Sequence, residues 1–301
     1  MASNILVLGA GELGISMLTA LAAQKPANST IAVLLRPSTI TQNTSPALPL
    51  LRGLNIDFLP GDISLSISEL AALFKPFDVV ISCLGFTCGP GSQLKICNAV
   101  LQAKVKRFFP WQFGVDYDII GRGSAQGLFD EQLDVRDILR GQGETEWVIV
   151  STGVFTSFLF EPAFGVVDLK DGEGVVRALG SWENEVTVTS VEDVGKLVAG
   201  MVFEKGEGKL GNEVVFTAGE TVSYAALAGV VDTVLGRKIR RELWSVEDLD
   251  GKDMMAMYRA VFAAGRGVAW GKDRSWNVRM RIEVEDVTGW MVRNIEKLRG
   301  E

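Results

Sequence analysis

Residues 4–14 read NILVLGAGELG, an apolar run followed at once by three glycines in the spacing G-x-G-x-x-G. The run Asn4–Leu8 has the composition of a parallel strand that is buried on both faces. From Glu12 to Gln24 apolar residues recur at helical spacing, and Lys25 and Pro26 end that pattern. The stretch therefore predicts a strand, a glycine turn and a helix, in that order.

The three glycines of this turn suit a dinucleotide. Gly9 permits the tight turn, Gly11 lets a pyrophosphate approach the backbone at the helix N-terminus, and Gly14 allows close packing of the helix on the strand. We expect these glycines, together with Glu12 and Leu13, to bind the cofactor. A structural turn without a ligand is the alternative, since glycines are common in turns. The flanking strand and the repeated strand and helix units favour the binding interpretation.

The same alternation continues for about half of the chain. Further strands are predicted at Thr30–Leu35, Ile56–Leu59, Asp78–Ser82, Val105–Phe109 and Trp147–Val150, with helices over Ile67–Phe74, Gly91–Ala103 and Ala125–Arg140. Strands that alternate with helices form a parallel sheet with right-handed crossovers. We therefore predict an α/β protein with a Rossmann-type, doubly wound parallel sheet.

The alternation becomes less regular beyond Ser151. Strands are expected at Gly174–Leu179, Glu185–Thr189 and Glu213–Thr217, and helices at Val191–Phe203, Tyr224–Leu235, Asp253–Ala264 and Glu283–Leu298. We expect a cofactor-binding Rossmann domain over residues 1–155 and a smaller C-terminal α/β domain over residues 156–301. The cleft between two such domains is the expected substrate site.

The end of the second strand bears on the choice of cofactor. A site selective for NAD usually has an acidic residue there, about twenty positions after the glycines, to hold the ribose hydroxyls. This chain instead has Arg36, Ser38 and Thr39, a guanidinium and two hydroxyls suited to a 2′-phosphate. The sequence therefore favours NADP(H). The alternative is that Arg36 is a solvated charge at the end of a strand.

Charge and composition exclude several classes of function. The formal net charge is -7 and the pI is about 5.0, whereas binding of nucleic acid needs a basic face. The chain contains 0 histidines, which excludes Ser-His-Asp and Cys-His catalysis. We expect a small-molecule partner and no nucleic acid. No sequence pattern indicates the oligomeric state.

The cysteines and the most apolar segments indicate the compartment. Cys83, Cys88 and Cys97 form no C-x-x-C pair, so neither a disulfide framework nor a zinc site is expected. The first residues carry no basic segment with a cleavage site, and the apolar stretch Trp147–Phe164 is interrupted by polar residues. We expect a cytoplasmic protein without a signal peptide, a membrane span or a metal.

Four segments carry a resemblance to a known family. They are VLGAGELG at 7–14, LLRPST at 34–39, QLKICNAVLQAKVKRFFPWQFGVD at 93–116 and TVTSVEDVGKLVAGMV at 187–202. Over essentially its whole length the chain resembles the isoflavone reductase-like and NmrA-like branch of the atypical short-chain dehydrogenases. The resemblance implies that residues 186–203 return to the Rossmann domain. It also implies an NADPH-dependent reductase of small aromatic compounds, or a relative that senses the cofactor.

The catalytic lysine of these reductases falls on Gln132 here. The family pattern is F-E-x-K-x-x-V-R, and residues 129–136 read FDEQLDVR. The helical spacing of Leu128, Gln132, Val135 and Leu139 places a polar side chain in an otherwise apolar stripe. Gln132 is therefore the candidate catalytic residue. The alternative is a hydrogen-bonded structural amide.

Two further family features are altered. Trp111 and Gln112 stand where relatives commonly have Ser-Glu, and none of the three tyrosines is followed by lysine four residues later. No standard proton donor of the superfamily is left.

The family layout implies where the cofactor and substrate lie. Gly85, Phe86, Val154 and Phe155 would flank the nicotinamide, with Gln112 also in the cofactor site. The acceptor would face Trp111 and Phe113, and Phe158, Tyr258 and Phe262 would line the substrate side. Aromatic residues at helical spacing are also typical of a core, which is the alternative for this last group.

Three functions remain open on the sequence. Glutamine forms hydrogen bonds but delivers no proton at neutral pH, so hydride transfer to an activated quinone, enone or iminium is the favoured reaction. We expect such an acceptor to be an aromatic intermediate of specialised metabolism. A non-redox isomerase, cyclase or dehydratase is the second possibility, and a regulator that senses NADP without catalysis is the third.

Overall fold

The computed structural model describes residues 3–169, 174–204, 209–246, 249 and 253–299. The contacts divide the chain into two compact units. The first unit comprises Met1–Gln112, Asp134–Val150 and Val194–Val215, and the second comprises Phe113–Leu133, Ser151–Asp193 and Phe216–Glu301. The chain thus passes between the units repeatedly, where the sequence suggested a boundary near residue 155 and one return over 186–203.

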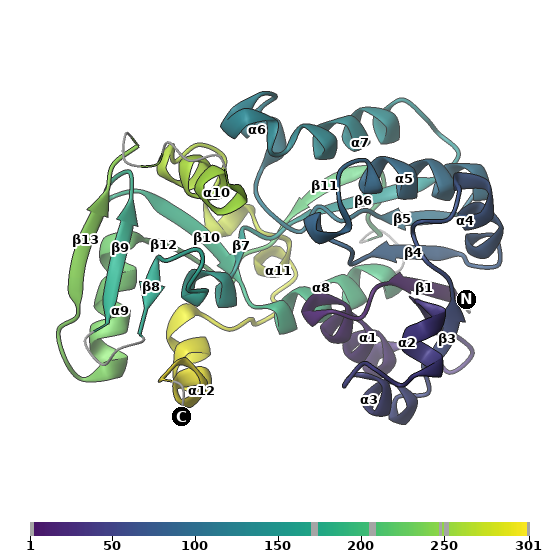
Figure 1. Ribbon diagram of the computed structural model, residues 1–301, viewed down its shortest axis with the longest axis horizontal. Helices are drawn as coiled ribbons and strands as arrows, with labels where there is room; N and C mark the ends of the chain where they lie inside the picture. Colours follow the sequence, from purple (N-terminus) through teal and green to yellow (C-terminus); the bar gives the residue numbers. More distant parts are fainter. Residues whose placement is uncertain (1–2, 170–173, 205–208, 247–248, 250–252, 300–301) are drawn as a thin grey trace. The chain divides into compact units, whose positions relative to one another are not determined.

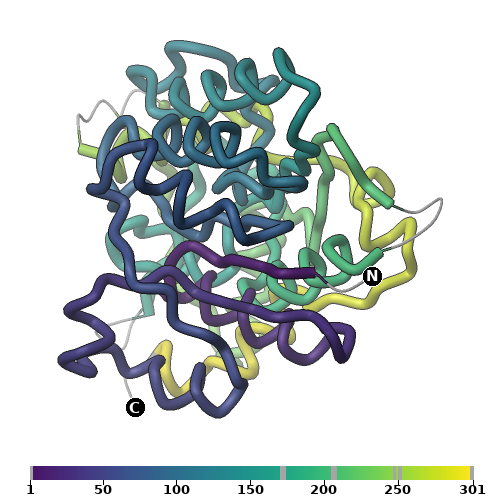
Figure 2. The backbone as a smooth tube through the Cα atoms, turned by 90° about the vertical axis from the view of Figure 1, so that its right-hand side faces the viewer, coloured from purple at the N-terminus to yellow at the C-terminus, as the bar shows by residue number. Residues whose placement is uncertain are grey.

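A seven-stranded sheet forms the centre of the first unit (Figure 1). Its strand order is β11-β6-β5-β4-β1-β2-β3, and every pairing from β3 through β6 is parallel. The strands are β1 Asn4–Leu8, β2 Thr30–Leu35, β3 Asp57–Pro60, β4 Val79–Ser82, β5 Arg107–Phe109, β6 Glu146–Ser151 and β11 Glu213–Phe216. This confirms the doubly wound parallel sheet. In Figure 2, β1 (purple) can be followed from the N-terminal end through the sheet.

The longer helices of this unit follow from the apolar periodicity of the sequence, whereas its two shortest helices were not predicted. They are α1 Glu12–Gln24, α2 Pro37–Thr41, α3 Leu48–Gly53, α4 Ile67–Phe74 and α5 Ser92–Ala103, together with parts of α7 Asp130–Arg140 and α8 Val191–Phe203. Ser66 starts α4 through a capping box with Glu69. Ile96 and Val100, one turn apart on α5, are buried in one cluster with strand residues such as Leu6.

Two predicted helices begin later than expected, and one of them starts at Val287 rather than at Glu283. The pattern predicted a helix from Ala125, but α7 begins at Asp130 and a 3₁₀ turn, η2 Ser124–Gly127, precedes it. Ala125 and Gln126 have φ angles of 44° and 60°. A right-handed helix cannot continue through residues in the left-handed region, so the prediction was wrong at this end.

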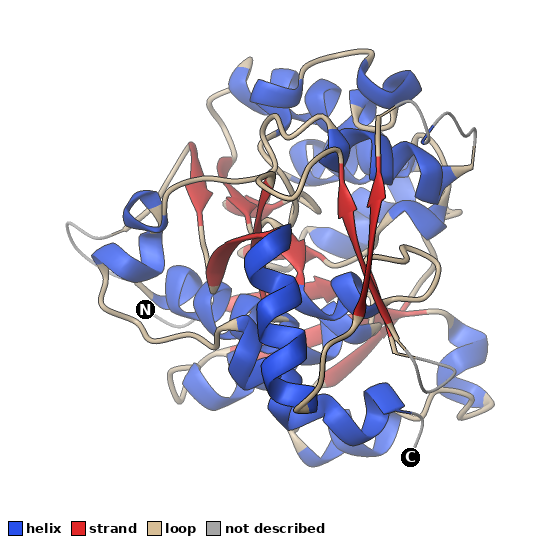
Figure 3. Cartoon of the chain, turned by 90° about the vertical axis from the view of Figure 1, so that its left-hand side faces the viewer, coloured by secondary structure: helices blue, strands red, loops and turns tan. Residues whose placement is uncertain are grey.

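The second unit contains two three-stranded sheets, β12-β10-β7 and β13-β9-β8. Its strands are β7 Val154–Phe155, β8 Val167–Asp168, β9 Val175–Leu179, β10 Glu185–Thr189, β12 Glu220–Ser223 and β13 Arg240–Trp244. Figure 3 shows β9 and β13 as two neighbouring strands pointing the same way, in agreement with their parallel pairing. The predicted strand at 213–217 is not part of these sheets; as β11 it lies beside β6 at the edge of the large sheet.

The helices of the second unit are short to medium in length. They are α6 Tyr117–Ile120, α9 Tyr224–Leu235, α10 Met254–Ala263, α11 Trp276–Arg279 and α12 Val287–Arg299, with 3₁₀ turns η3 Thr156–Phe160 and η6 Lys272–Arg274. Throughout the described ranges, no helix has the length and apolar character needed to cross a membrane.

Candidate functional site

The glycine turn after β1 is shaped by two close approaches. Gly9 has a φ of 93°, and a Cβ placed there would lie 2.6 Å from Leu84 Cδ2. A Cβ on Gly14 would overlap the carbonyl oxygen of Gly9. These two glycines are therefore required by the backbone of the turn and by the packing of α1 against it.

Gly11 differs from its two neighbours. It is the N-cap of α1, and a Cβ built on it would meet no atom within 4 Å. No side chain caps this helix end, and Gly11 and Glu12 are exposed whereas Leu13 and Gly14 are buried. The open space lies where backbone N–H groups and the helix dipole attract an anion, so these residues fit a pyrophosphate.

Arg36, at the end of β2, pairs with an acid. Its Nε lies 2.9 Å from Asp62 Oδ2, although the side chain is 73% exposed. The backbone N–H of Ser64 donates to Asp62 Oδ1 at 2.7 Å, and hydrogen bonds from Ser64 followed by Arg36 hold the pKa of Asp62 below its usual range. The guanidinium is thus exposed to solvent and paired with a carboxylate. Ser38 is exposed and Thr39 half-buried in the short helix α2.

The sequence reasoning missed Asp62, although its position could have revealed it. Asp62 follows β3 by two residues, and β3 pairs in parallel with β2. The carboxyl ends of parallel neighbours meet at one edge of a sheet. A charged residue after one strand is therefore a candidate partner for a charged residue after the next.

Trp111 packs on the turn that follows β4. A Cβ on Gly85 would lie 3.0 Å from Trp111 Cζ2, and the rings of Phe86 and Trp111 meet edge to face with centroids 4.7 Å apart. The structure therefore brings together Gly85 and Phe86, expected beside the nicotinamide, with Trp111, expected beside the acceptor. All three belong to the first unit.

Gln112 is joined to a buried guanidinium. Gln112 is 1% exposed and Arg136 on α7 is 0% exposed, and Arg136 Nε donates to Gln112 Oε1 at 2.7 Å. A charge in the interior needs hydrogen-bond acceptors, so the amide oxygen of Gln112 is used inside the protein. Arg136 was missed as a site residue. The available signal was its spacing of four from Gln132, which places it near the same buried helix face.

Gln132 lies where the periodicity of α7 predicted. It is 1% exposed, Val135 and Leu139 are buried and Leu128 is half-buried, which confirms a polar residue within an inward-facing stripe. Asp130, half-buried at the start of the same helix, accepts a hydrogen bond from the backbone N–H of Gly123 at 2.8 Å. Gln132 is assigned to the second unit, and α7 continues into the first unit at Asp134.

Six aromatic side chains of the second unit form one cluster. The ring contacts are Tyr117–Phe129 at 4.9 Å, Phe129–Tyr258 at 5.7 Å, Tyr258–Phe158 at 5.6 Å, Phe158–Phe164 at 4.6 Å and Phe164–Phe262 at 5.6 Å. The three predicted substrate-side residues are all members of this aromatic cluster. Phe262 is fully buried, as in a core, whereas Phe158 and Tyr258 are half-buried. Phe113 is buried in the same unit.

The phenol of Tyr258 is a weak acid. Burial, followed by the nearby Tyr117, raises the pKa of Tyr258 well above its usual value. At neutral pH the phenol therefore stays protonated and serves as a hydrogen-bonding group.

Val154 and Phe155 form the short strand β7 beside β10. Val154 pairs with Val188 and Phe155 with Thr189 in parallel register. The preceding Gly153 has a φ of 70°, and a Cβ on it would overlap the carbonyl oxygen of Thr187. Both residues expected beside the nicotinamide thus belong to the second unit, unlike Gly85 and Phe86.

Neither thiol nor metal chemistry is indicated in the part of the chain that the structure describes. No group of three or more Cys, Asp or Glu side chains there could hold a metal ion. Burial raises the pKa of Cys83 and Cys88, and raises that of Cys97 to about 12. All three cysteines are therefore thiols at neutral pH rather than nucleophilic thiolates.

Comparison with known proteins identifies the family. Residues 1–269 match the model of the NmrA-like family. An NmrA-like family domain-containing oxidoreductase of Gibberella moniliformis is 48% identical over 94% of this chain and 95% of its own length. Phenylcoumaran benzylic ether reductase Betv6 of Betula pendula is 30% identical over 64% of this chain and 65% of its own length.

Solved structures share the fold at low sequence identity. An isoflavone reductase aligns with a TM-score of 0.79 at 18% identity and covers 98% of this chain and 100% of its own. The complex of leucoanthocyanidin reductase with NADPH from Vitis vinifera aligns with a TM-score of 0.76 at 18% identity, covering 97% and 99%. At such identities the likeness is one of fold.

Proposed function

The chain belongs to the NmrA-like family, and from this premise we propose that it is an NADPH-dependent reductase of a small, activated aromatic acceptor. Relatives named as oxidoreductases and reductases support the reaction class. The residues of this chain supply the finer parts of the proposal, which are the cofactor, the kind of acceptor and the role of each side chain.

The order of the strands supports the part of the proposal that concerns the cofactor. The glycine turn, Arg36 and the Gly85–Phe86 turn follow β1, β2 and β4, which are adjacent strands with β1 in the middle. The chain leaves β1 toward β2 on one side and reaches β4 on the other, so β1 lies at the switch point where open α/β sheets bind ligands.

The parts of NADPH have candidate partners at this sheet edge. The backbone N–H groups of residues 12–14, at the open end of α1, would bind the pyrophosphate. Arg36 would bind the 2′-phosphate, and the hydroxyls of Ser38 and Thr39 would lie within reach of the same phosphate. When bound, NADPH supplies a hydride from its nicotinamide ring, and Gly85 and Phe86 would border that ring.

Gln132 determines which acceptors are suitable. Its amide can donate a hydrogen bond to an oxygen or nitrogen that gains negative charge, but it carries no proton to deliver. A quinone, conjugated enone or iminium accepts a hydride without prior protonation, so orientation and charge stabilisation suffice. The aromatic cluster of the second unit offers ring surfaces on which such a planar substrate would stack.

The proposal is tested with purified protein, NADPH and a panel of quinones, enones and iminiums. We expect loss of NADPH absorbance with at least one acceptor, and a slower reaction with NADH. Turnover without NADPH consumption would replace the proposal with a non-redox enzyme. Tight NADPH binding, inertness toward the whole panel and recovery of a stable protein partner would replace it with a cofactor-sensing regulator.

A further inference from the structure

Helix α10 presents different side chains on two sides. Tyr258 and Phe262 lie one turn apart and contact the aromatic cluster. At 3.6 residues per turn, Ala260 lies on the opposite side of the helix, Val261 lies on its flank, and Ala264 follows just after the helix ends. These residues of α10 can therefore line a site other than the aromatic cluster.

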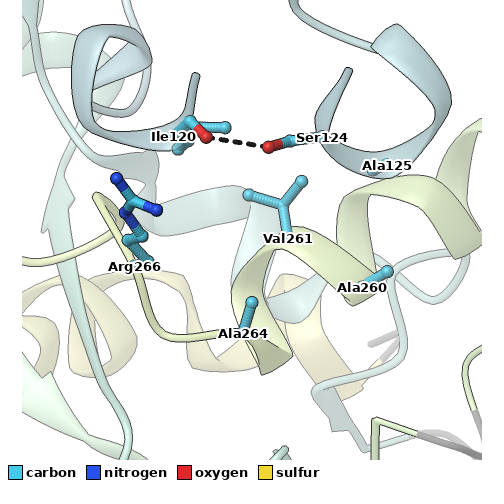
Figure 4. A pocket seen from close by; sticks show the side chains of 7 residues that line it. All are labelled: Ile120, Ser124, Ala125, Ala260, Val261, Ala264 and Arg266. Atoms are coloured by element: carbon cyan, nitrogen blue, oxygen red, sulfur yellow. Dashed lines mark hydrogen bonds between the residues drawn. The ribbon is translucent and has the colours of Figure 1, made fainter. Parts of the chain in front are cut away.

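A pocket of about 290 Å³ is lined in part by these residues. Figure 4 shows Val261 directed from α10 toward the segment that holds Ile120 and Ser124, with the guanidinium of Arg266 to one side. Its lining residues all belong to the second unit: Ile120, Ser124, Ala125, Ala260, Val261, Ala264 and Arg266. The volume is near the lower end of the range of small-molecule sites, about 300–1,000 Å³.

The pocket is apolar except for one cation. Five of its seven lining residues have aliphatic side chains. The hydroxyl of Ser124 donates to the carbonyl oxygen of Ile120 at 2.8 Å, which occupies its proton. Arg266 is exposed, and among the described residues it forms no ion pair or side-chain hydrogen bond. No carboxylate lines the pocket, so the cation has no acid to neutralise it there.

One wall of the pocket is a strained turn. Ala125 has a φ of 44° and the next residue, Gln126, has a φ of 60°. Side chains disfavour this conformation, and it persists only where the surroundings fix it, often at ligand sites. Asp130 fixes the turn from its far end by accepting from the N–H of Gly123. The turn leads directly into the helical turn that carries Gln132.

We propose that this pocket binds a small organic anion with an apolar body, such as a carboxylate or sulfonate attached to one or two rings. The aliphatic walls would cover the ring, and Arg266 would pair with the anionic group at the open side. This site is distinct from the aromatic cluster, because none of the six aromatic residues of the cluster lines the pocket. The proposal does not depend on hydride transfer, so a binding measurement is sufficient to test it.

The test measures binding of 8-anilino-1-naphthalenesulfonate by fluorescence, with saturating NADP⁺ present to occupy any nucleotide site. Cinnamate serves as a competing anion, and cinnamyl alcohol serves as its neutral counterpart. Arg266→Gln removes the cation, and Ala264→Phe fills the pocket at an exposed position. Arg279→Gln, which changes another exposed arginine of the second unit outside the pocket, is the matched control.

We expect saturable binding that cinnamate reverses and cinnamyl alcohol does not. Loss of a charge-assisted hydrogen bond should weaken binding about tenfold in Arg266→Gln. Ala264→Phe should abolish binding, and Arg279→Gln should leave it unchanged. Circular dichroism and thermal unfolding establish that each variant is folded. Absence of binding, or equal affinities in the wild type, Arg266→Gln and Ala264→Phe, would overturn the proposal.

Discussion

Arg136 donates its Nε–H to Oε1 of Gln112 at 2.7 Å, and both side chains are buried. Gln112 follows Trp111, which packs on Gly85 at the end of β4. Helix α7 thus holds the segment after β5, and that segment covers the turn proposed to border the nicotinamide. We therefore propose that Gln112 acts on the site by positioning its neighbour Trp111.

The hydrogen bond between these two residues should contribute measurably to stability. Gln112→Ala removes an acceptor from a buried charge, which should lower the free energy of unfolding by about 1.5–3 kcal/mol. Urea denaturation monitored by fluorescence gives this value. Gln102→Ala, at an exposed glutamine of the same unit, should change it by no more than about 0.5 kcal/mol. Equal effects of the two substitutions would refute the role assigned to Gln112.

Gly11 and Gly14 should respond differently to alanine. Gly14→Ala forces a methyl group into the carbonyl of Gly9, so we expect a marked fall in melting temperature. Gly11→Ala meets no protein atom and has a φ of -77°, so the fold should be retained while NADPH affinity falls. Thermal unfolding and NADPH titration separate the two effects. Unchanged NADPH affinity in a folded Gly11→Ala variant would show that the pyrophosphate lies elsewhere.

Arg36 should discriminate between the two nicotinamide cofactors. Only NADPH carries the 2′-phosphate, so Arg36→Ala should weaken NADPH binding about tenfold to a hundredfold and leave NADH binding nearly unchanged. Calorimetric titration with each cofactor measures the difference. Equal losses for both cofactors would remove the basis for the NADP preference.

The parallel sheet could be predicted from the sequence because buried parallel strands and their helices carry strong local patterns. The stripe containing Gln132 was predictable for the same reason. Asp62 and Arg136 were missed because their roles depend on partners distant in the sequence, Arg36 and Gln112. Local periodicity contains no information about such pairs.

The early start predicted for α7 has a different cause. Apolar and polar residues keep a helical order through 125–129, yet Ala125 and Gln126 adopt left-handed backbone angles. Alanine and glutamine both favour helices, so intrinsic propensity argued for the wrong conformation. The hydrogen bond from Gly123 to Asp130, which closes the loop around these residues, is one contact that stabilises the left-handed turn against that preference.

Gln132 can be tested by two substitutions. If its amide stabilises charge on the acceptor, Gln132→Ala should lower kcat/KM about tenfold or more on a substrate found in the panel, with NADPH affinity retained. Gln132→Lys should lower it too, because a buried ammonium replaces a fitted amide. Steady-state kinetics of each variant measure these changes in kcat/KM. A Gln132→Lys variant with higher activity and a fully active Gln132→Ala variant would instead identify a degraded lysine site.

Asp232 should make the stability of the second unit sensitive to acid. Its Oδ2 lies 2.7 Å from Arg241 Nη2, and the N–H of Ile239 donates to Oδ1 at 2.9 Å. Hydrogen bonding from Arg241 is the largest cause that lowers the pKa of Asp232 well below its usual value. A lowered pKa stabilises the folded state above the unfolded value of about 3.9, and this stabilisation is lost as the pH falls further.

The corresponding measurement is the melting temperature as a function of pH. Asp232→Asn should melt lower than the wild type near neutrality, and the difference should shrink as the pH falls below about 4. Glu185→Gln, at an exposed carboxylate of the same unit, should follow the wild type. A constant difference between Asp232→Asn and the wild type at every pH would contradict this account.

The most direct test of the reductase proposal follows the hydride itself. NADPH carrying deuterium at the transferable position of its nicotinamide is incubated with the protein and an acceptor of the quinone, enone or iminium class, and the product is analysed by mass spectrometry. The account predicts one deuterium in each product molecule and one NADPH oxidised for each product formed. A product formed without deuterium and without NADPH oxidation would contradict it.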